Sequence, residues 1–216
     1  MKKSQMKVCL PISAKLVEHS DKHGIGTCFL VRGKSEGVKL VTCAHLATED
    51  VNFADLTRWP SFFSLYAARL SPIALALFAT EHGPRRPTFQ PLRVAGGVMA
   101  DLVALPVPNA LSGTLTGVRV FDLAADSHSP SAGEEVVSYG FPFSGKPWPD
   151  AEPNKMVGPY LSRRQTGAHE AKIGMQKGHS GGPVLSKSGK LIGMGIGQQG
   201  DVDRIIAVDV IQLLVR

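Results

Sequence analysis

Residues 178–185 read Gly-His-Ser-Gly-Gly-Pro-Val-Leu. Gly181 and Gly182 can take backbone angles that other residues resist, so the chain can turn sharply just after Ser180. A serine in such a turn can be presented together with backbone N–H groups that point at one spot. We interpret the segment as part of a functional site, because an ordinary loop seldom needs glycines on both sides of a serine and a proline after them.

Two other segments supply residues that could activate this serine. His45 ends an apolar, β-like run, and Asp101 opens the apolar run 102–105. A serine hydroxyl is a weak nucleophile, so it needs a base within hydrogen-bond reach, and the base needs a partner that orients it. We predict that His45 takes the proton of Ser180 and that Asp101 holds the tautomer of His45. The backbone N–H groups of Gly178 and Ser180 are expected to form an oxyanion hole.

Short apolar runs separated by turn residues dominate the rest of the chain and predict an all-β sandwich or barrel. Runs 26–32 and 38–42 look like a hairpin. Residues 209–216 begin with an aspartate and continue as an apolar run, which predicts a short C-terminal helix capped by Asp209. The other predicted strands are 63–70, 73–80, 102–107, 118–123, 135–139, 156–161, 167–173, 183–186, 191–196 and 204–208.

The length of 216 residues suits one domain of two halves. A loop-rich zone at 106–116 divides the predicted strands into two sets. We expect residues 1–112 to form an N-terminal β-barrel half that carries the histidine and the aspartate. Residues 113–216 are expected to form a C-terminal half with the serine and the terminal helix.

The composition argues against several kinds of partner. There are 24 Lys and Arg against 18 Asp and Glu, a net charge of +6, but no basic run is long enough to mark a nucleic-acid surface. No phosphate-loop motif occurs, and Cys9, Cys28 and Cys43 lack metal-site spacing, so no cofactor or metal is expected. We expect three buried thiols; a bridge between Cys28 and Cys43 is sterically possible, although a reducing compartment disfavours it.

Membrane and export signals are weak. The apolar stretch 72–80 is far shorter than the roughly 20 residues that span a bilayer. The basic start is followed by only three apolar residues before Pro11, fewer than the roughly 7–15 of a secretory signal. We therefore predict a cytoplasmic protein without a membrane partner.

The sequence resembles the trypsin-like (chymotrypsin-fold) serine peptidases, in particular their compact bacterial and viral members. The resemblance implies a double six-stranded β-barrel with the catalytic site in the cleft between the barrels, and a triad in the chain order His, Asp, Ser found here. We can place no feature of the family in residues 51–92. The segments that carry the likeness are 26–31, 41–45, 101–105, 178–185, 189–193 and 206–209.

One departure from the family concerns the residue before the nucleophile. His179 stands where digestive members carry an aspartate, which pairs with a new N-terminal amine after zymogen cleavage. We therefore expect activity without N-terminal trimming, with the oxyanion loop ordered by packing, by a partner or by substrate. An alternative interpretation makes His179 a plain surface residue.

A second departure concerns the primary specificity pocket. The position of Gly174 holds no acid, and a buried cationic side chain is costly without a counter-charge. We predict weak cleavage after Lys or Arg and a preference for small or medium apolar P1 residues, although Asp201 or Asp203 could reach the pocket from a following loop. The resemblance implies six lining residues, Gly174, Met175, Gln176, Gly195, Ile196 and Gly197.

The leading interpretation is a serine endopeptidase that cleaves a protein or peptide substrate through an acyl-enzyme. Its substrate range is expected to be narrow, or a regulatory protein partner is expected to gate the site. Two alternatives stay open, a catalytically silent binding module with the protease fold and an esterase with the same triad. Trp59 and Trp148 are expected to anchor loops, or else to line the cleft. Structural or surface roles are expected for His19, His23, His82, His128 and His169.

Overall fold

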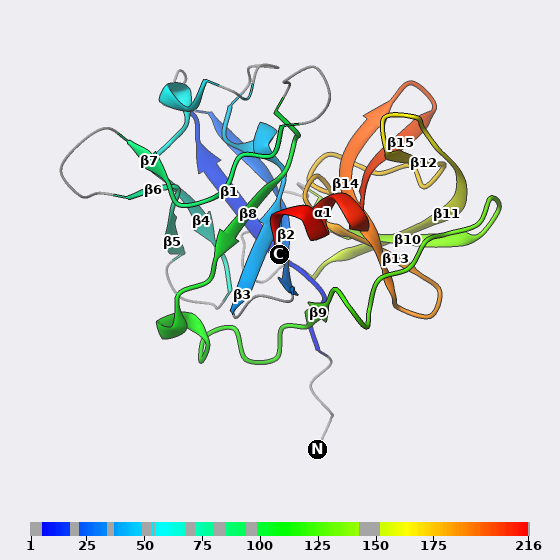
Figure 1. The fold of residues 1–216 in the computed structure, drawn as a ribbon, viewed down its shortest axis with the longest axis horizontal. Coiled ribbons are helices and arrows are strands. Elements are labelled where there is room, and N and C mark those ends of the chain that lie inside the picture. The colour runs from blue at the N-terminus through cyan, green and yellow to red at the C-terminus, as the bar shows by residue number, and fades with distance from the viewer. Residues whose placement is uncertain are drawn as a thin grey trace.

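The computed structural model describes residues 6–17, 22–33, 37–48, 53, 55–67, 72–79, 85–93, 99–142 and 152–215. These residues are mainly β-strands, with an α-helix, α1 (Val208–Leu214), near the C-terminus (Figure 1). The strands are β1 (Leu10–Lys15), β2 (His23–Arg32), β3 (Val38–Thr42), β4 (Phe62–Leu65), β5 (Ile73–Ala76), β6 (Phe78–Ala79), β7 (Arg86–Pro87), β8 (Val103–Pro106), β9 (Val120–Asp122), β10 (Glu135–Gly140), β11 (Asn154–Arg163), β12 (Ala168–Ala171), β13 (Pro183–Ser186), β14 (Leu191–Gln199) and β15 (Val202–Ala207).

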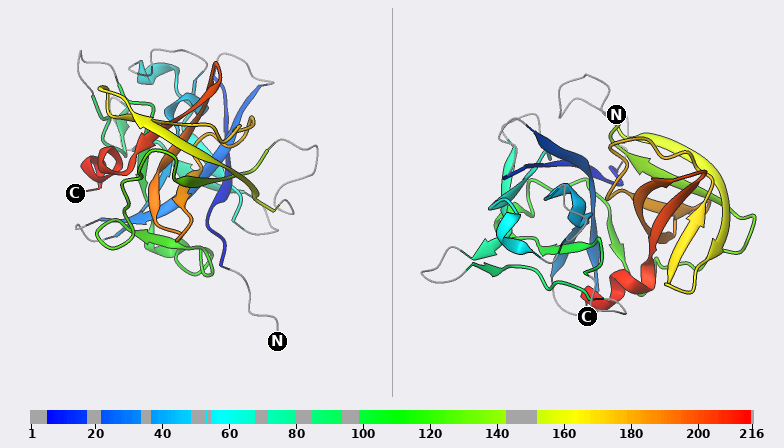
Figure 2. Two further views of the ribbon diagram at one scale, coloured as in Figure 1. Left: turned by 90° about the vertical axis from the view of Figure 1, so that its right-hand side faces the viewer. Right: turned by 90° about the horizontal axis from the view of Figure 1, so that it is seen from above.

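The strands form two bodies that lie side by side (Figure 2). In the first, the neighbours run in the order β5-β4-β1-β2-β3-β8, and β9 pairs with β2 to make a seven-stranded sheet. In the second, β10-β11-β12-β15-β14-β13 close into a six-stranded barrel. The all-β class is therefore confirmed. Of the two expected six-stranded barrels, one is closed as predicted, whereas the described strands of the other form an open sheet.

Most predicted strands are present, and the exceptions have local causes. The predicted run 73–80 is interrupted at Leu77, which separates β5 from β6. Strand β1 was not predicted, because Pro11 lacks the N–H of a regular strand residue. Pro11 pairs with Thr27 of β2, and its carbonyl accepts a hydrogen bond from the Tyr66 N–H at 3.1 Å, at the end of the β1–β4 pairing, which starts at Ile12.

The C-terminal helix is present, but its predicted cap is wrong. The N-cap residue is Ala207, and Asp209 lies in the first turn, where a carboxylate still favours the helix dipole. The Asp209 carboxylate accepts a hydrogen bond from Arg163 at 2.6 Å. The helix α1 packs on β14 and β15. Its buried residues are Val208, Ile211 and Leu214, which lie on one face of the helix. Lys39 of the first sheet donates to the Leu214 carbonyl at 2.8 Å, so the helix end also contacts the first body.

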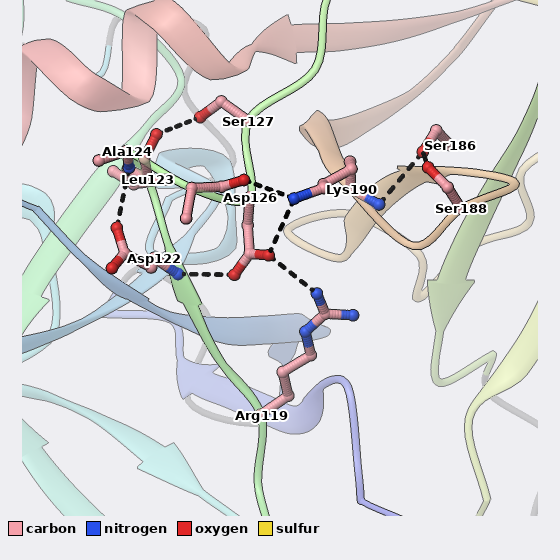
Figure 3. Close-up of polar contacts among 10 residues, drawn as sticks. Arg119, Asp122, Leu123, Ala124, Asp126, Ser127, Ser186, Ser188 and Lys190 are labelled. Carbon is pink, nitrogen blue, oxygen red and sulfur yellow. Dashed lines mark hydrogen bonds and ion pairs between the residues drawn. The ribbon is translucent and has the colours of Figure 1, made fainter.

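The segment that leaves β9 is attached to the second barrel by a polar cluster (Figure 3). Asp126 binds Arg119 at 3.3 Å and lies 3.8 Å from the Lys190 ammonium, which also donates to the Ala125 carbonyl. The Asp126 carbonyl accepts the Leu191 N–H at 2.6 Å. Because β9 pairs with β2 and the residues after it pair with the start of β14, this connection joins the two bodies. The predicted boundary after residue 112 stays a prediction.

The larger hydrophobic core fills the first body and continues beneath α1 into the second barrel, where Leu185 and Met194 belong to it. A smaller cluster around Val136 and Ile205 fills the closed barrel. None of the helices in the described part of the chain combines the length and the hydropathy needed to cross a bilayer.

Candidate active site

His45 and Asp101 are brought together by the pairing of β3 with β8. These strands are antiparallel, with Thr42 opposite Val103, so the end of one lies beside the start of the other. The His45 N–H donates to Asp101 Oδ1 at 2.8 Å, and His45 Nδ1 lies 2.6 Å from Asp101 Oδ2. An ionised carboxylate only accepts hydrogen bonds, so Nδ1 is the donor of this pair, and in the neutral imidazole Nε2 is the atom with the lone pair. The His45 side chain is about one-third exposed (32%), so the ring is accessible from solvent.

Ser180 lies in a tight turn directly before β13. The His179 N–H donates to the Gln176 carbonyl at 3.0 Å, and Gly178 has φ +100°, as the third residue of a type II turn requires. Gly181 has φ +84°, and a Cβ on it would lie 2.1 Å from the Thr27 carbonyl oxygen. Both positions therefore require glycine, which is the property that singled out this segment in the sequence.

The turn leaves two neighbouring N–H groups available. The N–H groups of His179, Gly181 and Gly182 all donate to backbone carbonyls. Within the described ranges, those of Gly178 and Ser180 have no such acceptor. These two are the expected donors of the oxyanion hole, so the turn can offer both to a developing negative charge.

The hydroxyl of Ser180 is not hydrogen-bonded to His45 in this structure. It donates to the Ile196 carbonyl of β14 at 2.7 Å, and no hydrogen bond joins it to His45 among the described residues. The two segments are nevertheless adjacent, since a Cβ on Gly181 would lie 3.1 Å from the Cys43 nitrogen, two residues before His45. Of the three predicted residues, the structure thus pairs the histidine with the aspartate and leaves the serine hydroxyl on another acceptor.

Cys43 lies behind the His45–Asp101 pair. Its side chain is fully buried, and its thiol donates to the Gly195 carbonyl at 3.4 Å. Burial, together with the nearby Asp101 charge, raises the pKa of this thiol well above its usual range. The donor atoms of Cys43, His45 and Asp101 lie within 4.8 Å of one another. Two of these atoms, His45 Nδ1 and Asp101 Oδ2, are already hydrogen-bonded to each other at 2.6 Å.

Of the other two thiols, Cys28 lies in β2 and Cys9 directly precedes β1. Cys9 and Cys28 are free and buried, and Cys28 donates to the Leu10 carbonyl at 3.5 Å. Burial raises the pKa of both thiols. The three buried thiols are confirmed, and the bridge between Cys28 and Cys43 is not formed.

The expected pocket residues come from two segments that do meet. A Cβ on Gly195 would lie 2.7 Å from Met175 Sδ, and one on Gly197 would lie 3.9 Å from Ser180 Oγ. Met175 is buried, Gly174 takes φ +75°, and a Cβ there would lie 3.9 Å from the end of Met156. Gln176 is exposed and contributes its carbonyl to the turn. The side chains of Met156 and Met175 are therefore the apolar neighbours of these two segments, and one carboxylate also reaches them.

That carboxylate belongs to Asp203, which is 1% exposed. It accepts the backbone N–H groups of Ile173, Gly174 and Met175 at 2.7, 2.7 and 2.9 Å. Asp201 is exposed instead. Asp203 thus reaches the pocket segment, but its oxygens are bound by the main chain that forms the wall.

His179 is not a surface residue, so that interpretation is wrong. It is fully buried, its Nδ1 lies 3.1 Å from Ser138 Oγ, and burial lowers its pKa. A Cβ on Gly140 would lie 2.6 Å from the ring, so Gly140 makes room for the imidazole. His169 is also buried and bonds the Tyr160 hydroxyl at 2.8 Å, a structural role as expected.

Trp59 has the loop-anchoring role. It is fully buried and stacks on Phe89 with ring centroids 5.3 Å apart, so it does not line a cleft. Trp148, His19 and His82 lie outside the described residues.

Thr27 was not among the predicted site residues, yet it contacts the turn that carries Ser180. This fully buried residue of β2 donates its N–H to the Ser180 carbonyl and its hydroxyl to the Gly178 carbonyl, both at 2.8 Å. The available signal was a lone hydroxyl within an otherwise apolar strand, between Gly26 and Cys28. A buried hydroxyl needs partners, and here the partners lie in the turn of the serine.

Comparison with known proteins identifies the family and the fold. The family model described as a trypsin-like peptidase domain matches residues 26–194. No curated protein sequence matches the chain. Among solved structures, the active form of the Rv3671c protease from M. tuberculosis is 14% identical, with a TM-score of 0.61 over 98% of this chain and 81% of that one.

Two further structures have the same fold. A thermostable serine protease from an extremophilic microorganism is 12% identical, with a TM-score of 0.61 over 99% of this chain and 97% of that one. The serine endoprotease from Yersinia pestis is 12% identical, with a TM-score of 0.57 over 99% of this chain and 64% of that one. Identities this low show only the fold, but the family model covers most of the chain. The chain therefore belongs to the trypsin-like serine peptidases, hydrolases that act on peptide bonds.

Proposed function

We propose that this chain is a serine endopeptidase in which His45, Asp101 and Ser180 form the catalytic triad. The observation that carries the proposal is the doubly hydrogen-bonded His45–Asp101 pair next to a turn that presents Ser180 and two N–H groups without a backbone acceptor among the described residues. The proposed substrate is a protein or peptide, and the cytoplasmic location stays a prediction.

Catalysis begins with a rotation of the serine side chain. The Ser180 hydroxyl leaves the Ile196 carbonyl and turns to Nε2 of His45, which takes its proton as the oxygen attacks the scissile carbonyl carbon. The N–H groups of Gly178 and Ser180 bind the oxyanion, a contribution of about 10²–10³ in rate for one donor. The imidazolium, held by Asp101, then protonates the leaving amine, and water hydrolyses the acyl-enzyme by the same route.

A fluorophosphonate probe tests the triad directly. We expect it to label Ser180, with labelling lost in Ser180→Ala and in His45→Ala. Cys43→Ala is the matched control, because it changes a buried neighbour that takes no part in the proposed chemistry. Labelling that persists in Ser180→Ala would contradict the proposal.

The proposed specificity follows from the pocket residues. With Gly174 at the position of the usual acid, and with the Asp203 carboxylate bound by three backbone N–H groups, a cationic P1 side chain lacks a free counter-charge. We propose a small or medium apolar P1 residue. A peptide library in which cleavage after Arg dominates would contradict this, and Asp203→Asn would show whether that carboxylate is responsible.

We also propose that the site is gated by substrate or by a protein partner, rather than by N-terminal trimming. The Ser180–Ile196 hydrogen bond supports this, because it ties the hydroxyl to the strand expected to line the pocket. The buried His179 leaves no carboxylate at its position to pair with a new amine. If trimming at one N-terminal site switched on an inactive longer form, this part of the proposal would fail.

The same hydrogen bond also favours the alternative of a catalytically silent binding module, since the hydroxyl points away from its base. A wild-type protein that resists the fluorophosphonate, alone and with candidate partners, would support this alternative. A panel of peptide and ester substrates separates a peptidase from an esterase.

A further inference from the structure

The residue that links the nucleophile turn to the first body is Thr27, and every polar atom of it is engaged. Its N–H donates to the Ser180 carbonyl at 2.8 Å. Its hydroxyl donates to the Gly178 carbonyl at 2.8 Å and accepts the Phe141 N–H at 3.0 Å. Its carbonyl accepts the Thr42 hydroxyl at 2.8 Å.

The main-chain groups of Thr27 are free for these contacts because of its position in the β1–β2 ladder. Its partner in the β1–β2 register is Pro11, which has no N–H and whose carbonyl bonds Tyr66 on the far side. The main-chain groups of Thr27 therefore face away from β1, toward Thr42 and Ser180. Pro11 and Thr27 form a non-hydrogen-bonded pair, and in an antiparallel ladder the main-chain groups of every such pair point away from the partner strand.

The turn that carries Ser180 approaches Thr27 closely. A Cβ on Gly181 would lie 2.1 Å from the Thr27 carbonyl, and one on Gly26 would lie 2.6 Å from the Ser180 carbonyl. A Cβ on Gly182 would lie 3.3 Å from the methyl group of Thr27. Glycines on both sides thus allow the turn and β2 to approach at backbone distance.

We propose that Thr27 is a positioning residue that holds the catalytic turn in its working shape, an inference that rests on the proposed peptidase function. Its two donors bind the carbonyls of the peptides that follow Gly178 and Ser180. These are the two residues whose N–H groups form the proposed oxyanion hole, so the anchored peptides fix their Cα positions. Because His45 is also held on the first body, Thr27 sets the turn relative to the base as well.

The test compares four single substitutions under conditions in which each variant is folded. Thr27→Val keeps the shape and removes the hydroxyl, whereas Thr27→Ser keeps the hydroxyl and removes the methyl group. Thr27→Ala differs from the serine variant by one oxygen, and this pair replaces the valine variant if that one does not fold. Ser13→Ala removes another buried hydroxyl, which lies 3.3 Å from the Tyr66 hydroxyl, and controls for stability alone.

The readout is the second-order rate of fluorophosphonate labelling against pH, measured where circular dichroism shows each variant fully folded. We expect the plateau rate to fall by roughly 10–100-fold in Thr27→Val and Thr27→Ala and to stay within about threefold in Thr27→Ser and Ser13→Ala. The midpoint of the pH profile, which reports the base, stays in place. A role in stability alone would shift the melting temperature and leave the plateau unchanged.

The outcomes separate the two proposals. The role of Thr27 alone would be overturned if the wild-type protein is labelled at Ser180 and either of two results is found. One is an unchanged plateau rate in Thr27→Val, and the other is equal plateau rates in Thr27→Ser and Thr27→Ala. A wild-type protein that is not labelled at Ser180 would overturn the proposed function, and the role of Thr27 with it.

Discussion

At the scale of single residues, the candidate site depends on which atom of His45 carries a proton. Asp101 accepts both the main-chain N–H and Nδ1 of His45, which leaves Nε2 as the basic atom. In Asp101→Asn the amide can turn an N–H toward Nδ1, and that favours the wrong tautomer. We expect a rate loss on the order of 10⁴, the size of the effect in trypsin-type triads, with little change in stability.

Fluorophosphonate labelling or peptide turnover of Asp101→Asn measures this loss. Asp209→Asn is the control, because it neutralises a carboxylate whose partner is the half-exposed Arg163 on the helix side. A variant at position 101 that keeps more than about a tenth of the wild-type rate would argue that the pair is structural.

At the scale of elements, the decisive contact is that of the nucleophile turn with β2. Gly181→Ala would place a Cβ 2.1 Å from the Thr27 carbonyl at a residue with φ +84°, so the backbone has to move. We expect the free energy of unfolding to fall by about 2 kcal/mol or more, with labelling of Ser180 lost.

Gly113→Ala provides the matched comparison. Nothing lies within 4 Å of a Cβ at Gly113, and its φ is not positive. We expect a change of no more than about 1 kcal/mol, toward higher stability if anything, with full labelling. Urea unfolding of both variants checks the contrast, and equal stability would show that the turn can move away from β2.

At the scale of the whole molecule, two buried histidines make stability depend on pH. Burial lowers the pKa of His169, with Arg163 adding to the effect and Asp209 opposing it, and burial lowers that of His179 against an opposing contribution from Asp203. The folded protein therefore resists protonation at both. As the pH falls below about 6.5, the unfolded chain takes up protons that the folded one does not, so stability decreases.

Urea unfolding between pH 8 and pH 5 measures this dependence. We expect the contribution of the two histidines to the free energy of unfolding to be nearly constant above about pH 7.5. It should decline from about pH 6.5 down to the lowered pKa values of the two histidines in the folded protein. His169→Asn and His179→Asn, which keep a side-chain partner for Tyr160 and Ser138, should each make the decline shallower. An unchanged slope in both variants would assign the acid sensitivity to other groups.

Local chemistry accounts for how much could be predicted. Strands β3 and β13 match their predicted ranges, because each is a short apolar run between turn residues. The glycines around Ser180 pointed to a special turn, because φ values above zero favour glycine wherever they occur. Strand β1 was not predicted, because whether a proline fits inside a strand depends on how the neighbouring strands pair with it.

The amino-acid sequence by itself determined the all-β class, the family and the residue types of the candidate site, since these follow from periodicity, turn residues and short motifs. Only the tertiary structure decided the partners of buried polar groups. In the folded protein, the buried His179 is hydrogen-bonded to Ser138, and Asp203 accepts three backbone N–H groups. The Ser180 hydroxyl donates to the Ile196 carbonyl. A hydrogen bond needs atoms within about 3 Å, and folding alone brings residues such as Thr27 and Gly178 that close.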